Sequence, residues 1–322
     1  MPRSLRALPL ALLLALTVGS SALADERAGE RPLPPSRAEL ERSTEAFLER
    51  HGRVGDSRSA PGPTKTPARF GGLFPESRVV SLYGAPQLPA TILGRKSPGR
   101  AVEKLRRQSR PYRRRLDESV VKAFDLIATI ATPCQSSADC CRFHQPDSLI
   151  ATYLNKVRAV RGRLVLDIQP GRARVLDEVR HLREWILMPD VDVAIDPEWH
   201  VREGESPGTH DGSIGSRQLN RVSRKLQRMV ATHDLPPKLM VVHQYREGSI
   251  RHRGLVRRRH DVDVTLNFDG IGSASAKRAG YRNLGTERLF GGFSLFYRLD
   301  QGLMSPGDVV RMPPPASYVM YQ

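Results

Sequence analysis

Eight short apolar runs, rich in Val, Ile and Leu, recur between residues 77 and 322 and constrain the fold more than any other feature. They occupy residues 77–84, 124–133, 163–171, 191–199, 238–246, 262–270, 292–300 and 317–322. Such short, β-branched runs are typical of parallel strands buried on both faces. Stretches with helical spacing separate them, at residues 101–118, 147–160, 173–187, 216–233, 250–259, 274–284 and 305–312. The alternation predicts βαβ units.

Eight units over residues 76–322 match the usual size of a (β/α)₈ barrel, about 250 residues. An open doubly wound sheet is the alternative, but it normally carries a glycine-rich phosphate loop after its first strand. Here the first run continues into YGAPQLPATILG, without G-x-G-x-x-G. We therefore predict an α/β fold, a TIM barrel that lacks the final helix. We expect a short helix near residues 36–52 to pack over the seam that this leaves.

The segment before the barrel has two parts. A basic start and an apolar core ending in Ala22-Leu23-Ala24 predict a secretory signal peptide over residues 1–24. A membrane anchor is the alternative, but the apolar part is short. Residues 25–75 are rich in Pro, Gly and Ser and predict a linker. We expect a secreted or periplasmic protein with no transmembrane segment after cleavage.

The formal net charge is +17. A basic surface attracts polyanions, so outside the cytoplasm we expect a carbohydrate or an anionic cell-wall polymer as partner, and no nucleic acid. The alternative is that the arginines lie on solvated helix faces. The oligomeric state does not follow from the sequence.

Three cysteines, Cys134, Cys140 and Cys141, lie within one short segment. In an oxidising compartment Cys134 would bridge to Cys140 or to Cys141, which leaves one thiol. A zinc site is the weaker interpretation, because no fourth ligand is obvious beyond His144.

Polar residues collect where the predicted strands end. In a barrel these ends converge on one mouth, where active sites lie. The set suits hydrogen bonding to hydroxyls and stacking on a sugar ring. It comprises Tyr83, Thr132, Asp167, Gln169, Asp196, Glu198, His243, Gln244, Tyr245, Asn267, Asp269, Tyr297, Asp300, Tyr321 and Gln322, with Trp199 nearby.

The most informative pair is Asp196 and Glu198, which follow the fourth run in AIDPEW. Residues two apart on a strand point the same way, and two carboxylates in one confined site raise the pKa of one of them. Glu198 is then the candidate general acid for a glycosidic bond and Asp196 its modulator. Asp269 or Asp300 would face them as base or electrostatic partner. The bland alternative is that Asp196 only braces the following loop.

Asp196-x-Glu198 resembles the D-x-E motif of chitinase-type and muramidase-type glycoside hydrolases. The resemblance implies a barrel with Glu198 as acid, Asp196 as partner, and a tyrosine, Tyr245 or Tyr297, completing the site. Asp192 is out of register with that motif and Pro197 separates the acids. SLYGAP, AIDPEW, VVHQY, MSPGDVV and YVMYQ are similar to a family of uncharacterised secreted bacterial barrel proteins, which implies no activity.

Other chemistries rank lower. Asp167, Asp196, His243 and Asp269 could meet around a metal, but Tyr83 and Gly84 stand where many metal-dependent barrel hydrolases carry H-x-H. The nucleophile elbow G-x-S-x-G is absent. We therefore expect no metal and no cofactor. The competing class to an enzyme is a non-catalytic glycan-binding or cell-wall-binding protein on the same scaffold.

Overall fold

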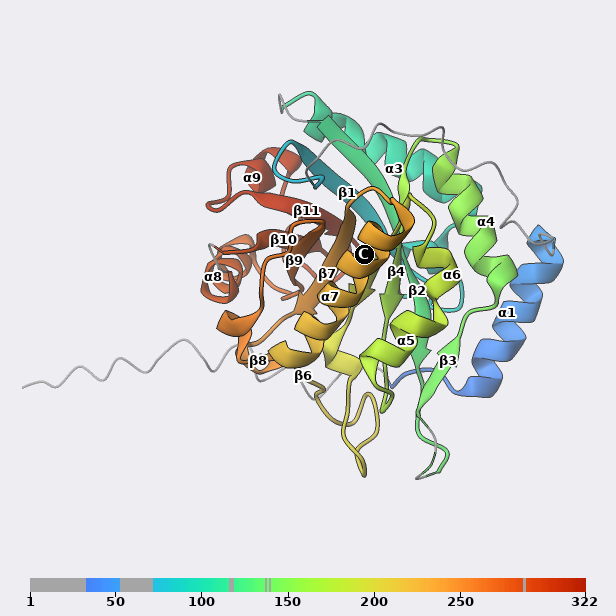
Figure 1. Cartoon of the computed structure of the whole chain (residues 1–322). Coiled ribbons are helices and arrows are strands. Elements are labelled where there is room, and N and C mark those ends of the chain that lie inside the picture. The colour runs from blue at the N-terminus through green and yellow to red at the C-terminus, as the bar shows by residue number, and fades with distance from the viewer. Residues whose placement is uncertain (1–32, 53–71, 116–118, 137, 139, 286–287) are drawn as a thin grey trace, which may run out of the picture. The chain divides into compact units, whose positions relative to one another are not determined.

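The computed structural model describes residues 33–52, 72–115, 119–136, 138, 140–285 and 288–322 (Figure 1). The signal peptide predicted at 1–24 and most of the linker predicted at 25–75 lie outside these residues, so both stay predictions. Among the described residues, none of the helices has the length and apolar character needed to cross a bilayer.

Eight parallel strands close into a barrel, which confirms the predicted fold. Around the ring the order is β1, β2, β4, β5, β7, β9, β10 and β11, and β11 pairs with β1. Each predicted run overlaps one strand. The bounds are β1 Ser77–Gly84, β2 Ser119–Ala131, β4 Arg163–Ile168, β5 Val191–Ile195, β7 Lys238–Gln244, β9 Val262–Phe268, β10 Phe290–Leu295 and β11 Ala316–Tyr321.

In the described part of the chain, three short strands lie outside the ring of eight. β3 (Arg142–His144) runs antiparallel to the end of β2. β6 (Ile214–Gly215) and β8 (Ile250–Arg251) form a separate two-stranded sheet. All three follow the C-terminal end of a barrel strand, so they frame the mouth.

Helices surround the barrel, as Figure 1 shows. They are α1 Arg37–His51, α2 Ile92–Arg95, α3 Pro98–Arg113, α4 Asp147–Arg158, α5 Val175–His181, α6 Arg183–Ile186, α7 Ser216–His233, α8 Ala274–Leu284 and α9 Pro306–Val310. The helix predicted at residues 250–259 is wrong, because this segment holds β8 and a 3₁₀ turn at Arg253–Leu255. α7 already packs on both β7 and β9, so their crossover needs no second helix.

Two hydrophobic cores follow from the strand alternation. Inward residues such as Val79, Val165 and Val241 fill the barrel. Outward residues such as Leu166 and Val193 pack against the helices. The interior of the barrel is therefore filled by packed side chains. The polar side chains that point inward are grouped at certain heights along the barrel axis.

The N-terminal end of the barrel is closed by the chain just before β1. The Asp263 carboxylate accepts hydrogen bonds from the backbone N–H groups of Leu73 (2.5 Å) and Phe74 (3.3 Å). At the same level Arg163, which is partly exposed, and the buried Asp192 form an ion pair of 2.5 Å. These contacts close the N-terminal end of the barrel, so we expect a functional site at the C-terminal end.

α1 does not cover the seam between β11 and β1, so that expectation is wrong. The helix begins with a capping box between Ser36 and Glu39 and packs on α4 and β3. The seam is instead covered by α3, whose Tyr112 hydroxyl lies 2.6 Å from that of Tyr321 on β11. The proline inside α3, Pro111, does not prevent this packing.

Candidate functional site

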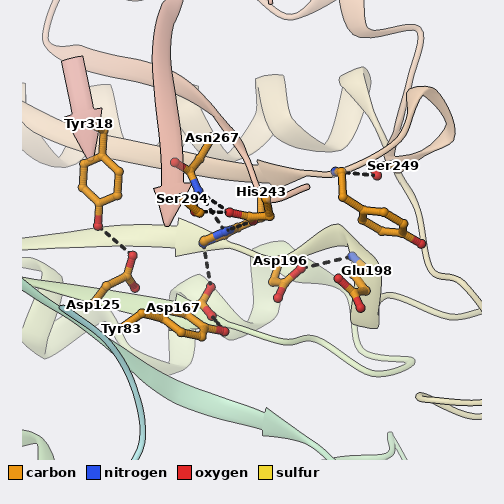
Figure 2. A network of polar contacts seen from close by, with 12 residues as sticks. Tyr83, Asp125, Asp167, Asp196, Glu198, His243, Ser249, Asn267, Ser294 and Tyr318 are labelled. Atoms are coloured by element: carbon orange, nitrogen blue, oxygen red, sulfur yellow. Dashed lines mark hydrogen bonds and ion pairs between the residues drawn. The ribbon is translucent and has the colours of Figure 1, made fainter. Parts of the chain in front are cut away.

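Nine polar side chains point into the barrel, most of them from near the C-terminal ends of the strands, and we name this set the polar centre. Figure 2 shows most of its members. All except Asp269 are at most 6 % exposed. Strand alternation brings them together, since inward residues are spaced by two. The members are Tyr83, Asp125, Asp167, Asp196, His243, Asn267, Asp269, Ser294 and Tyr318.

His243 on β7 is held by residues of β9 and β10. Its Nδ1 lies 2.5 Å from Oδ2 of Asp269, and the other Asp269 oxygen accepts a hydrogen bond of 2.6 Å from Asn267 Nδ2. The Ser294 hydroxyl donates to the same oxygen. A carboxylate on Nδ1 fixes the orientation of the imidazole and directs Nε2 into the barrel.

Asp167 on β4 lies beside this imidazole. Its Oδ1 is 3.8 Å from His243 Nε2, and its Oδ2 accepts a hydrogen bond of 3.2 Å from the Tyr83 hydroxyl. Gln169 Nε2 lies 3.4 Å from the same hydroxyl, and its Oε1 accepts from the backbone N–H of Ala131. Tyr83, Asp167, Gln169 and His243 are thus neighbours, as the strand-end set suggested.

Asp125 on β2 is a member of the polar centre that the sequence analysis missed. It is fully buried, and its Oδ2 accepts a hydrogen bond of 2.7 Å from the Tyr318 hydroxyl of β11. Asp125 lies in the middle of its strand, where it pairs in register with Tyr83 of β1. The sequence signal that could have identified Asp125 is the presence of a carboxylate inside an apolar run, FDLIA.

The pKa values of the polar centre are shifted because several acids share one buried volume. Burial raises the pKa of Asp125 to about 8, and repulsion from Asp167 adds to the increase. Burial also raises the pKa of Asp167 to about 6, although His243 and the Tyr83 hydroxyl oppose it. Burial by itself lowers the pKa of His243, but attraction to Asp269 and their hydrogen bond raise it well above the ordinary value. The neighbouring acids therefore favour the protonated imidazole, and burial favours the neutral form of the carboxyls.

Three ligand-type atoms of the polar centre converge. One ligand atom from each of Asp125, Asp167 and His243 lies within 4.8 Å of the other two. Oδ1 of Asp125, Oδ1 of Asp167 and Nε2 of His243 are buried and have no hydrogen-bond partner among the residues that the structure describes. Two carboxylate oxygens and one imidazole nitrogen form a donor set that a divalent metal ion accepts.

Asp196 and Glu198 lie on one bend after β5. Asp196 is buried, and its Oδ1 accepts the backbone N–H of Glu198 at 3.2 Å, which caps the 3₁₀ turn Pro197–Trp199. Burial raises the pKa of Asp196 well above its ordinary value; His243 opposes this increase and Glu198 adds to it. Figure 2 shows Asp196 between the inner residues and Glu198. The bend therefore places the Asp196 carboxyl inside the barrel and the Glu198 carboxyl at the rim of the mouth.

The rim carries partly exposed side chains that a ligand in the mouth could touch. Glu198 and Trp199 on the 3₁₀ turn are half-buried, as is Tyr245 after β7. The Tyr245 hydroxyl accepts a hydrogen bond of 3.1 Å from Arg246 Nε, so its ring is held in place. These three side chains offer one acid and two aromatic faces at the same end of the barrel.

Two residues of the strand-end set lie behind the barrel wall, against α8. The Gln244 amide donates to the carbonyl of Leu284 at 2.9 Å. Asp300 forms a buried ion pair with Lys277, with both carboxylate oxygens 2.7 Å from Nζ. Asp300 therefore does not face Glu198 across the mouth, and this corrects the expectation that it would.

Two tyrosines of the set also turn outward, against α3. The Tyr297 hydroxyl donates to Gln108 Oε1 at 2.5 Å, and Tyr321 bonds Tyr112 while its ring stacks on that of Tyr297. Tyr245, at the rim, is therefore better placed than Tyr297 to contribute a hydroxyl to the mouth.

The loops after β2 and β5 contact each other beyond the C-terminal ends of the strands. Cys134 and Cys141 form a disulfide, which confirms a predicted pair, and Cys140 remains free. The backbone N–H of Cys134 donates to Ser206 Oγ at 3.3 Å. Arg172 ties the two loops together, because its guanidinium donates to the carbonyls of Glu205 (2.8 Å) and Ser136 (3.3 Å).

Gly171, which follows β4, occupies a position that requires glycine. Gly171 has φ of +58°, and a Cβ there would lie 2.3 Å from the Cys140 carbonyl oxygen. A side chain would therefore push the disulfide loop off β4.

No protein family model, no curated protein and no solved structure matches this chain. What the site does has to be inferred from its own geometry and chemistry.

Proposed function

We propose that the barrel is a hydrolase that acts on a glycan at its mouth, with Glu198 as proton donor and Asp196 as its partner. One observation carries the proposal: Asp196 Oδ1 accepts the Glu198 backbone N–H, which fixes a buried carboxyl beside a rim carboxyl on one bend. Cleavage of a glycosidic bond needs an acid for the leaving oxygen and a second carboxylate near the sugar ring.

The rest of the mouth limits which residues take part. Asp300 is committed to Lys277, and Asp269 is committed to His243 and Asn267. The acid–base pair therefore reduces to Asp196 and Glu198. In this arrangement Glu198 protonates the leaving oxygen as the glycosidic bond breaks, water adds to the sugar carbon, and the proton that the water loses restores the acid form of Glu198. Asp196 positions Glu198 through its hydrogen bond to the Glu198 backbone N–H.

The aromatic rim supports a sugar as ligand. Trp199 adjoins Glu198 in the chain, and Tyr245 stands after β7, which pairs with β5. Aromatic faces stack on the apolar faces of sugar rings, and a polar rim satisfies the hydroxyls.

Replacing Glu198 by Gln tests the assignment of the acid. We expect product release from cell-wall glycan to fall by about 10²–10⁴-fold, the usual contribution of a general acid, while binding of the glycan changes little. Glu203→Gln is the matched control, since Glu203 is exposed on the loop that follows and loses the same charge. Equal turnover in wild type and Glu198→Gln would rule out Glu198 as the acid.

A non-catalytic glycan-binding protein is the second candidate. The burial of the polar centre favours it, since a glycan in the mouth would meet rim residues and leave most inner carboxyls untouched. Under this alternative the wild type releases no product from any wall preparation, and wild type and Glu198→Gln bind insoluble wall equally well.

We also propose that the partner is anionic and meets a basic cleft at the other end of the barrel. This cleft, about 400 Å³, lies between the end of α3, the start of β2 and the turn after α4. Five cations line it, and no carboxylate does among the described residues: Arg106, Arg110, Arg113, Lys122 and Arg161. Such a concentration of positive charge attracts polyanions.

Retention on a dextran sulfate column tests the cleft. We expect Arg106→Gln/Arg110→Gln to elute at lower salt than Arg224→Gln/Arg228→Gln, which removes the same charge at the same spacing from exposed positions of α7. Identical elution of the two double variants would show that only total charge matters.

The disulfide is consistent with an oxidising compartment. Export of the chain remains a proposal that rests on this bond and on the sequence of residues 1–24.

A further inference from the structure

We propose that the barrel centre binds a divalent metal ion between Asp125 Oδ1, Asp167 Oδ1 and His243 Nε2. This goes beyond the proposed glycan hydrolysis and stands independently of it. It also departs from the expectation of a metal-free site, because the sequence did not bring Asp125 into the set.

The spacing of the three atoms fits a coordination site. Zinc lies about 2.0–2.2 Å from imidazole nitrogen and carboxylate oxygen, so two ligands of a tetrahedral ion are about 3.4 Å apart. Asp167 Oδ1 and His243 Nε2 are 3.8 Å apart, and one ligand atom from each of Asp125, Asp167 and His243 lies within 4.8 Å of the other two. The separations are therefore at most about 1.4 Å wider than in an occupied zinc site, a difference that small side-chain movements would close.

The burial of these atoms is the second, independent observation. The three side chains are at most 3 % exposed, and none of the three atoms has a hydrogen-bond partner among the described residues. A buried polar atom without a partner is costly. Three of them on neighbouring residues are explained together by one cation.

The remaining atom of each ligand is held by an outer partner. Tyr318 donates to Asp125 Oδ2 at 2.7 Å and Tyr83 donates to Asp167 Oδ2 at 3.2 Å. Asp269 lies 2.5 Å from His243 Nδ1. A carboxylate behind a ligating histidine fixes the tautomer and raises its basicity, and such partners are a regular part of metal sites.

The donor set selects the class of ion. Two carboxylates and a neutral imidazole carry a charge of about −2, which a divalent ion neutralises. One nitrogen with two hard oxygens suits Zn²⁺ or Mn²⁺ better than Ca²⁺, which prefers six to eight oxygens. Three protein ligands are the number found in catalytic zinc sites, which keep a position open.

The competing state has no metal. In it a protonated His243 forms ion pairs with Asp167 and Asp269, at 3.8 Å and 2.5 Å. The two states differ in what occupies Nε2, a proton or an ion, so a direct measurement of bound metal separates them.

The experiment is metal titration of the purified full chain after dialysis against chelator. We expect one Zn²⁺ or Mn²⁺ per chain by elemental analysis, and a saturable calorimetric isotherm. Asp125→Asn and His243→Gln should each weaken binding by more than the roughly 10–100-fold that loss of an outer partner costs. His144→Gln should bind as wild type does, although His144 also pairs with a buried acid, Glu178, at 2.7 Å.

Two further measurements keep the outcome clear if a variant folds poorly. Co²⁺ should give a visible absorption band with the wild type that Zn²⁺ abolishes, and Zn²⁺ should raise the melting temperature of the wild type. Glu198→Gln should retain full metal affinity while it loses hydrolysis, so the two proposals fail separately. Less than one ion per chain at saturation, or equal affinity in wild type and Asp125→Asn, would overturn the metal site.

Discussion

Oδ2 of Asp269 lies 2.5 Å from Nδ1 of His243, and both residues belong to the ends of neighbouring parallel strands, β9 and β7. The contact orients the one histidine of the polar centre. Asn267 and Ser294 in turn hold Asp269, so the imidazole is positioned by a chain of three side chains.

Asp269→Asn should lower metal affinity by about 10–100-fold without removing a ligand, because an amide holds the imidazole less firmly than a carboxylate does. Competition with a chelator measures this change. Asp261→Asn is the control, since Asp261 makes a similar contact of 2.8 Å with His260 at the surface. An effect of equal size in both variants would mean that Asp269 has no special role.

The Lys277–Asp300 ion pair should be important for stability. Both side chains are 1 % exposed, and removing one partner of such a pair strands a buried charge at a cost of about 3–5 kcal/mol. We expect Lys277→Met to lose that much in urea unfolding, and Lys277→Met/Asp300→Leu to recover part of it. Arg311→Met, which breaks an exposed pair with Asp308, should cost under about 1 kcal/mol. If Lys277→Met costs no more than Arg311→Met, the burial argument is wrong.

Lys238 makes stability depend on pH. Its Nζ is buried and donates to the carbonyls of Met188 and Val191, and burial lowers its pKa to about 7. A lysine in the unfolded chain has a pKa of about 10.4. Between these values the unfolded state binds the extra proton, so this group makes stability rise with pH from about 7 to about 10.

Urea unfolding across that range should therefore show a flatter pH dependence for Lys238→Met than for wild type. Lys156→Met, at an exposed position on α4, should leave the dependence unchanged. A wild-type slope that survives in Lys238→Met would assign it to another group.

The disulfide should stabilise the chain by about 2 kcal/mol, as closing a short loop does. We expect Cys134→Ser/Cys141→Ser to unfold at lower urea and to lose protection from proteolysis near Ser206, which Cys134 contacts. Cys140→Ser should match wild type, since that thiol is free. Peptide mass mapping that finds Cys140 in the bridge would contradict the pairing.

The fold was predictable because apolar runs of strand length indicate buried strands. The helical spacing of apolar residues between these runs indicates helices that bury one face. The side of each strand was predictable too, from alternation. His243 and Met320 point inward, so their chain neighbours Gln244 and Tyr321 had to point out. The prediction assigned every polar residue near a strand end to the mouth, so it did not separate inward residues from outward ones.

Two features depended on information that the sequence does not contain. Asp125 reaches the polar centre because β1 and β2 begin in register and β2 continues past the end of β1, so the middle of β2 lies beside Tyr83. Register between strands is a property of the closed ring. Asp300 meets Lys277 because α8 docks on β10, and that contact joins residues 23 positions apart.

The seam between β11 and β1 has a consequence for how the molecule folds. Tyr318 on the last strand holds Asp125 on the second, and β1 supplies Tyr83 to Asp167. The polar centre is therefore assembled from both extremes of the barrel sequence, and it is complete only once the ring has closed. Because such long-range pairings slow folding, ligand binding at the centre reports on closure of the ring, and a chain stalled one strand short lacks the Tyr318 hydroxyl that holds Asp125.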